Sequence, residues 1–321
     1  MYAFRNPSPN PHLAAQIYAF RDRFDRVVQN VERVVVGKDE IVRKALLTMI
    51  ARGHILFRDL PGTGKTTLAR ALAASIACDF RRIQFTPDLL PMDVTGASVL
   101  DLHRKALEFS RGPVFTHLLL ADEINRATPK TQSALLEVMA EGQVTVEGTT
   151  HRLEPPFLVL ATMNPLDHEG TYPLPAAQLD RFAVQLSLGF PSIDAEIRML
   201  DVHLSAVVEE SKPVVDRRTF LEWQQMVPGV YVSDALKRYA VHLANAVRCD
   251  ARALAPPSPR ATLTLVRVAQ AHALCAGRDF LLPEDVGAMA ADVLAHRVVI
   301  AGERSSRSFI EEVLRTVDAH P

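Results

Sequence analysis

The 321-residue sequence lacks the features that define several classes of protein. It has three cysteines, Cys78, Cys249 and Cys275, and they lie far apart without a CxxC pair or the Cys/His spacing of a zinc site. This pattern excludes a disulfide scaffold. It favours a reducing compartment, in which thiols stay free.

Neither sign of charge predominates, and no long apolar run occurs. The chain has 36 Lys and Arg residues against 37 Asp and Glu residues, so no overall positive field exists to attract nucleic acid. No stretch approaches the roughly 20 apolar residues of a membrane span, and the N-terminus lacks the apolar segment of a signal peptide. We therefore expect a soluble, cytoplasmic protein without a membrane span.

The length is enough for about two domains of ordinary size. Up to residue 190, short β-rich apolar runs alternate with helical patterns, which predicts an α/β fold with a parallel sheet and crossover helices. The predicted strands cover residues 54–57, 82–86, 116–121, 157–163 and 183–188. Several of these runs are apolar almost throughout, which is typical of strands that are covered on both faces.

From residue 191 onward, the apolar residues recur at helical spacing. The predicted helices cover residues 193–208, 233–247, 260–276 and 283–296, and most begin with Ser, Asp or Pro. The sequence thus predicts an α/β core at 1–190 and a smaller all-α domain at 191–321, with a Pro-rich loop at 251–259. A further helix at 13–34 leads into the core, after a Pro- and Asn-rich disordered or capping arm at 6–11.

The segment HILFRDLPGTGKTTLAR at residues 54–70 has the layout of a phosphate-binding loop: an apolar strand, a Gly-containing turn and a helix. Its backbone N–H groups and the helix N-terminus would form a concave donor array for phosphate oxygens. Lys65 would reach the β- and γ-phosphates, and the Thr66 hydroxyl would join a Mg²⁺ shell. Asp59 occupies the position where this motif usually has its first glycine. The predicted nucleotide contacts are Pro61, Gly62, Thr63, Gly64, Lys65, Thr66 and Thr67.

Polar residues follow two later strands, at the sheet edge where ligands of open α/β sheets bind. Asp122 and Glu123 end one apolar run, and we assign Asp122 to Mg²⁺ and Glu123 to the attacking water. Asn164 ends the next run, where its amide could orient that water, although Asn before Pro is also a common turn former. Arg181 and Arg260 are further candidates. Taken singly, an arginine in such a position is more often solvated or ion-paired than functional.

The order of these motifs resembles the AAA+ ATPases and, within them, the MoxR family. Besides the phosphate loop, the resemblance rests on LADEINRATPKTQSALLEVM at 120–139, GTYPLP at 170–175, QLDRF at 178–182 and GRDFLLPEDV at 277–286. It implies an AAA+ core with a helical lid, a helix-2 insert at about 92–112 and a β-hairpin at about 141–155. The alternating pattern around Gly148 supports that hairpin independently.

The resemblance also assigns roles to individual residues. It implies that Asn164 is the sensor-1 residue, Arg260 the sensor-2 residue of the lid, and Arg181 an arginine finger directed at a neighbouring subunit. Val36 and Gly37 are similar to the segment that frames adenine, although as plain sequence they could end any strand. Two positions depart from the family pattern, since Ala176 replaces a usual Glu and His117 a usual Asn.

The function implied by the resemblance is Mg²⁺-dependent ATP hydrolysis by a ring homo-oligomer, expected to be a hexamer. Hydrolysis would remodel or mature a protein client, for example by metal or cofactor insertion, with a partner that carries a von Willebrand factor A domain. The alternatives are a motor subunit for metal chelation or nucleic-acid remodelling, and a nucleotide switch without useful turnover. The near-neutral charge and the lack of a basic hairpin argue against nucleic acid.

Overall fold

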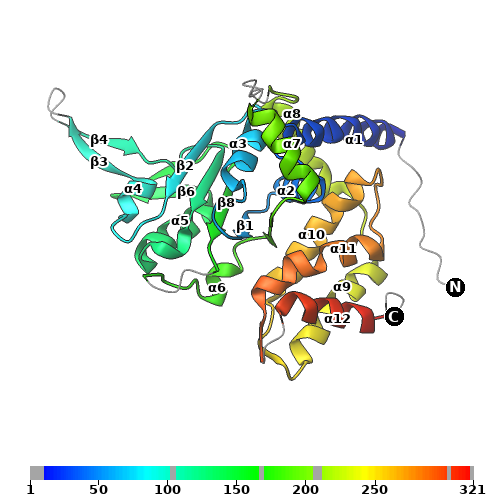
Figure 1. Ribbon diagram of the computed structural model, residues 1–321. Coiled ribbons are helices and arrows are strands. Elements are labelled where there is room, and N and C mark those ends of the chain that lie inside the picture. The colour runs from blue at the N-terminus through cyan, green and yellow to red at the C-terminus, as the bar shows by residue number, and fades with distance from the viewer. Residues whose placement is uncertain (1–10, 102–105, 166–169, 205–211, 302–304, 319–321) are drawn as a thin grey trace.

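A five-stranded parallel sheet forms the centre of the molecule in a computed structural model, which describes residues 11–101, 106–165, 170–204, 212–301 and 305–318. The strand order is β2-β5-β8-β1-β9 (Figure 1). The strands are β1 (Ile55–Arg58), β2 (Phe80–Gln84), β5 (Leu118–Asp122), β8 (Leu158–Met163) and β9 (Val184–Leu186). Each predicted strand is confirmed, with ends shifted by up to two residues.

Helices cover both faces of this sheet because successive side chains of each strand point to opposite sides. In β1, Ile55 and Phe57 join one apolar cluster, whereas Leu56 joins the other. The first cluster includes side chains of α1 (Pro11–Glu32), α2 (Asp39–Ile50) and α3 (Lys65–Ser75). The second includes side chains of α5 (Pro129–Glu141). The short helices α4 (Pro91–Thr95) and α6 (Ala176–Leu179) and the 3₁₀ turn η1 (Ile124–Arg126) complete this part.

Two antiparallel hairpins extend the α/β unit on the side away from the lid helices (Figure 1). One pairs β3 (Gly96–Asp101) with β4 (Ala106–Arg111), within the predicted insert, and the other pairs β6 (Gln143–Val146) with β7 (Thr149–Arg152). Glu147 and Gly148 connect β6 to β7 with positive φ angles of 49° and 79°, as a two-residue turn between twisted strands requires. The hairpins contact each other, since the rings of Phe109 and His151 stack with centroids 4.0 Å apart.

The helical lid is built from the C-terminal part of the chain. Its elements are α7 (Ile193–Leu204), α8 (Arg217–Met226), η2 (Val227–Gly229), α9 (Asp234–Cys249), α10 (Pro259–Cys275), α11 (Pro283–Leu294), η3 (Ala295–Arg297) and α12 (Ser306–Thr316). Ser233 and Ser258 accept hydrogen bonds from backbone N–H groups at the starts of α9 and α10, which confirms the predicted helix caps. The segment 251–259, expected to be a loop, contains β10 (Ala253–Ala255), which pairs with β11 (Val299–Ile300).

Lid and core share one continuous apolar cluster rather than two separate cores. Trp223 of α8 packs edge-on against Phe20 of α1, with ring centroids 5.0 Å apart, and α10 contacts both α1 and α2. The predicted arm at 6–11 lies almost wholly outside the described residues. Within them, we find no helix with the length and apolar character that crossing a bilayer requires.

Candidate functional site

The turn between β1 and α3 has the backbone geometry of a phosphate-binding loop. Gly64 immediately precedes α3 with φ +92°, and Gly62 has φ +80°. A Cβ atom at either position would meet no other atom within 4 Å, so the left-handed backbone, rather than lack of space, requires glycine here. The helix N-terminus adds its N–H groups and positive dipole end to this turn, which makes it suited to an anion.

A cavity of about 410 Å³ lies over this turn, at the carboxyl ends of β1, β2, β5 and β8. Ligands bind at this edge in open α/β sheets. Its lining residues are Asp59, Pro61, Gly62, Thr63, Gly64, Lys65, Thr66, Thr67, Arg82, Gln84, Asp122, Glu123, Thr162, Met163 and Asn164. The structure therefore brings the predicted loop, both acids and Asn164 together.

Lys65 points back at its own loop. Its Nζ donates to the carbonyl oxygen of Leu60 at 2.7 Å and to the Thr63 hydroxyl at 3.3 Å. Burial lowers the pKa of Lys65, while the nearby carboxylates of Asp59, Asp122 and Glu123 partly offset that effect. An anionic ligand would compensate the ammonium group better than neutral carbonyl groups do.

Asp122 is held by two neighbouring strands. Its Oδ2 accepts from Arg82 Nη2 of β2 at 2.6 Å, and its Oδ1 accepts from the Thr162 hydroxyl of β8 at 2.6 Å. The same hydroxyl oxygen accepts from the backbone N–H of Glu123 at 2.8 Å. Thr162 therefore fixes the positions of the two acids relative to each other.

Glu123 stands on a strained turn just beyond β5, with φ +56°. Its Oε2 accepts from Gln84 Nε2 at 2.7 Å and from Arg126 Nη1 at 2.9 Å. Both donors compete for the carboxylate oxygen that a general base would present to water. In this arrangement, Glu123 is turned toward β2.

The donor set in this cavity fits a nucleotide with Mg²⁺. Asp122 and Thr66 offer carboxylate and hydroxyl oxygens, which Mg²⁺ prefers, and the loop offers N–H donors for phosphates. Across the described part of the chain, no three His, Cys, Asp or Glu residues converge as a metal cage. A Mg²⁺ ion bound by Asp122 and Thr66 would take phosphate oxygens and water as its other ligands, as is usual for this ion.

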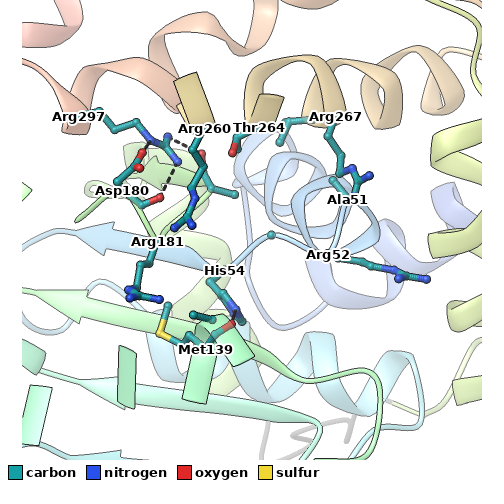
Figure 2. A pocket seen from close by; sticks show the side chains of 14 residues that line it. Ala51, Arg52, His54, Met139, Asp180, Arg181, Arg260, Thr264, Arg267 and Arg297 are labelled. Carbon is teal, nitrogen blue, oxygen red and sulfur yellow. Dashed lines mark hydrogen bonds and ion pairs between the residues drawn. The ribbon is translucent and has the colours of Figure 1, made fainter. Parts of the chain in front are cut away.

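Arg181 and Arg260 lie elsewhere, in a second cavity of about 450 Å³ between core and lid (Figure 2). Arg52, Arg267 and Arg297 also line this arginine pocket. Figure 2 shows these side chains coming from the α2–β1 turn, the segment before β9, α10 and η3. The carboxylate in the lining is that of Asp180, and it pairs with Arg297 at 2.7 Å. The pocket therefore has a strong excess of positive charge.

One hydrogen-bond network fixes the two halves of the arginine pocket relative to each other. Asp180 Oδ2 accepts from the hydroxyl of Ser258, two residues before Arg260, at 2.8 Å. Arg297 is almost fully buried and donates to the carbonyl oxygens of Phe182 at 2.6 Å and Ala183 at 3.0 Å. The lid and the segment that carries Arg181 are thus joined directly.

Val36 and Gly37 line neither cavity. They lie in the turn between α1 and α2, not at a strand end. Gly37 has φ +74°, and a Cβ atom there would come within 2.7 Å of the Cβ of Ala195 on α7. The predicted adenine-framing segment is thus packed against the first turns of α7.

The two departures from the family pattern also lie outside the nucleotide cavity. His117 is buried, and its ring nitrogens face the backbone N–H of Asp79 at 3.1 Å and the Arg217 guanidinium at 2.6 Å. Burial, together with Arg217, lowers the pKa of His117. Ala176 is exposed as the first residue of α6, on the segment that leads to Arg181.

Sequence reasoning missed several residues that line the two cavities, among them Arg82, Gln84, Thr162, Arg52, Arg267 and Arg297. Two signals were present. Arg82 and Gln84 are two apart on a strand, so their side chains share one face. Arg260 and Arg267 are seven apart on a helix and share a face likewise. No sequence signal pointed to Arg52, which stands in a turn with φ +60°.

Comparison with known proteins supports this description. Residues 54–184 match the model of the ATPase family associated with various cellular activities (AAA), and residues 245–317 match an AAA lid domain. The chain is 43% identical to the uncharacterized protein YeaC of Bacillus subtilis, over 91% of this chain and 93% of the relative. It is 38% identical to the chaperone MoxR1 of Mycobacterium tuberculosis, over 95% of this chain and 83% of that protein.

A solved structure has the same architecture. The crystal structure of an ATPase candidate from Cytophaga hutchinsonii superposes with a TM-score of 0.88 and 38% identity, covering 95% of this chain and 97% of that one. The fold is that of an AAA+ P-loop core with a helical lid. The chain belongs to the MoxR family of AAA+ ATPases.

Proposed function

We propose that this protein is a Mg²⁺-dependent ATPase whose complete catalytic site forms only between two copies of the chain. The observation that carries the proposal is the separation of the two cavities. The phosphate loop and acids line one, and Arg181 and Arg260 line the other. In a ring, the arginine pocket of one subunit would face the nucleotide of the next, and the family favours a hexamer.

Each residue then has a defined task. The loop N–H groups and Lys65 hold the phosphates, and Asn164 and Glu123 orient the attacking water. Glu123 accepts the proton of that water as the new P–O bond forms and the bond to the leaving oxygen breaks. Bound Mg²⁺, held by Thr66 and Asp122, would neutralise developing charge on the phosphate oxygens.

The arginine pocket supplies the remaining positive charge. Four of its guanidinium groups, those of Arg52, Arg181, Arg260 and Arg267, have no carboxylate partner among the residues that the structure describes. An arginine finger in related phosphoryl-transfer systems is worth about 10³–10⁵ in rate. We therefore expect an isolated subunit to bind ATP but to hydrolyse it slowly.

A mixing experiment tests the split site. Lys65→Ala removes phosphate binding and Arg181→Ala removes the finger, so each variant alone should be nearly inactive. In mixed rings, some sites combine an intact loop with an intact arginine, and turnover should recover. Glu123→Gln serves as the control that binds ATP without hydrolysing it. If mixed assemblies form, as shown by native mass spectrometry, and turnover does not recover, the split site is wrong.

We propose further that hydrolysis remodels or matures a protein client in the cytoplasm, in the manner that the name of the chaperone MoxR1 gives for that relative. The β3–β4 hairpin offers an exposed apolar contact surface, since Val99 and Leu100 are each 55% exposed and Leu107 is 63% exposed. A partner with a von Willebrand factor A domain, and metal or cofactor insertion as the outcome, follow from the resemblance. Purification of the tagged protein from its host, followed by mass spectrometry, tests for that partner.

A further inference from the structure

Asp59 occupies the position where the phosphate-loop motif usually has its first glycine. It follows β1 directly and is 6% exposed, although it borders the nucleotide cavity. A carboxylate removed from water in this way requires hydrogen-bond donors. The structure supplies three such donors to the Asp59 carboxylate.

All three donors belong to the segment that leaves the sheet for the lid. Asp59 Oδ1 accepts from the Ser187 hydroxyl at 2.6 Å and from the backbone N–H of Gly189 at 3.1 Å. Its Oδ2 accepts from the backbone N–H of Leu188 at 2.7 Å. These residues follow β9 and precede α7, and we call residues 187–190 the linker.

A second side chain of the core holds the opposite edge of the linker. Lys38 Nζ donates to the carbonyl oxygen of Leu188 at 2.5 Å and to that of Phe190 at 2.7 Å. Asp59 thus binds the N–H groups of the linker and Lys38 binds its carbonyl groups. The linker is fixed to the core by charged groups on both sides, which form stronger hydrogen bonds than neutral groups do.

Asp59 also contacts the residue that would hold the nucleotide. Its carbonyl oxygen lies 3.5 Å from Lys65 Nζ, and the next carbonyl oxygen, that of Leu60, accepts from the same ammonium at 2.7 Å. When Lys65 turns to a phosphate, residues 59 and 60 lose these contacts. Any resulting shift of Asp59 is transmitted to the linker, because the carboxylate is bonded to the linker directly.

We propose that Asp59 is a positioning residue that couples the occupancy of the phosphate loop to the placement of the lid through the linker. The proposal rests on the proposed nucleotide binding. It adds a role for a residue that a standard phosphate loop lacks. A glycine at this position could form the loop but could not hold the linker.

Hydrogen–deuterium exchange of the linker tests the contact without any catalysis. Two carboxylate oxygens of Asp59 accept from three donors, whereas the side chain in Asp59→Asn has one oxygen. Its NH₂ group cannot accept a hydrogen bond from a linker N–H. We expect exchange in peptides covering residues 187–190 to become about tenfold faster or more. Ser187→Ala removes one of the three donors to Asp59 and leaves the phosphate loop itself unchanged. Linker exchange should become faster in this variant too, but by less than in Asp59→Asn. Asp234→Asn, an exposed change on α9, is the matched control.

Nucleotide response distinguishes coupling from a merely structural role. In the wild type, ADP with Mg²⁺ should alter exchange in the linker and in lid peptides. In Asp59→Asn, ADP should bind with an affinity within about threefold of the wild type, since the loop backbone is intact, while the response of the linker and lid is lost. Turnover should then show a lower kcat with little change in KM.

The outcomes separate the two proposals. A nucleotide response of the linker and lid that is equal in the wild type and in Asp59→Asn would overturn the coupling role of Asp59, whether or not basal linker exchange changes and even in an active ATPase. A wild-type protein that binds ADP and shows the linker response, but does not hydrolyse ATP, would support the coupling and refute the proposed hydrolysis. A wild type that binds no nucleotide refutes both.

Discussion

The side-chain amide of Gln84 donates a 2.7 Å hydrogen bond to Oε2 of Glu123. This contact joins β2 to the residue just beyond β5, and Arg126 donates to the same oxygen at 2.9 Å. Both donors bind the same carboxylate oxygen, so each competes with a water molecule for that acceptor. Under the proposed mechanism, loss of one of these donors leaves Oε2 freer to accept from the attacking water.

Gln84→Ala should therefore raise the turnover of ATP. Removing one donor to a charged group should increase kcat by about two- to tenfold, with nucleotide affinity unchanged. Steady-state hydrolysis and a fluorescent-nucleotide titration measure the two quantities. Gln143→Ala, on β6 outside both cavities, is the control. A fall in kcat would mean that Gln84 holds Glu123 in its working position instead.

Arg267→Gln should lower turnover by about tenfold or more while leaving nucleotide binding intact, because this residue lines the arginine pocket and not the loop cavity. Turnover is measured at a concentration where native mass spectrometry shows full assembly. Arg218→Gln is the matched control, since Arg218 is 87% exposed on α8. Mixing Arg267→Gln with Lys65→Ala should restore part of the activity. Wild-type turnover in Arg267→Gln would remove this residue from the site.

Arg297→Met should destabilise the fold strongly. The guanidinium is almost fully buried and donates to Asp180 and to several backbone carbonyl groups, so its loss leaves buried carbonyl groups without a donor and the partly buried Asp180 carboxylate without its charged partner. Breaking a buried pair from one side costs about 3–5 kcal/mol. Urea unfolding measures this free energy, and Arg218→Met should change it by less than about 0.5 kcal/mol. Equal stability of the two variants would contradict a structural role for Arg297.

His296 should make the fold sensitive to acid. Burial, followed by the neighbouring Arg297, lowers its pKa from 6.5 to about 3, and its Nε2 contacts the carbonyl oxygen of Phe182 at 3.1 Å. Below pH 6.5 the unfolded chain binds a proton that the folded chain does not bind until about pH 3, so stability falls as the pH drops through this window.

His296→Gln should remove that part of the pH dependence. Between about pH 7.5 and pH 5, the wild type should lose about 2 kcal/mol more of its unfolding free energy than the variant does. Urea unfolding at the two pH values measures the difference. The other histidines are present in both proteins, so their contribution cancels. Parallel losses in the two proteins would show that His296 is not held neutral.

The sequence predicted the α/β core and the nucleotide cavity well, because these features depend on local patterns. Apolar runs of strand length gave all five strands of the sheet. Carboxyl ends of parallel strands meet at one edge, which is why the sequence alone predicts that Asp122, Glu123 and Asn164 lie near the loop. The short pair β10 and β11 was not predicted, since strands of three and two residues carry no periodic signal.

The sequence could not predict which distant side chains and backbone groups would form hydrogen bonds with each other. Asp59 was recognised as a departure from the loop motif, but its donors come about 130 positions later in the chain. The sequence also could not show that Arg260 lies beside Arg181 and away from the phosphate loop, because the position of α10 depends on how the lid packs against α1 and α2.

Local sequence patterns were sufficient to predict the elements, their order and the chemistry available at the strand ends. Strand and helix periodicity and the left-handed turns of Gly62 and Gly64 are local properties of the chain. The tertiary fold was needed to bring particular polar and charged groups within hydrogen-bonding distance. It placed Gln84 on Glu123, Asp59 on the linker and the arginines of core and lid around one pocket. The physical reason is that hydrogen bonds and ion pairs depend on distances of about 3 Å between atoms, and packing of distant segments sets those distances.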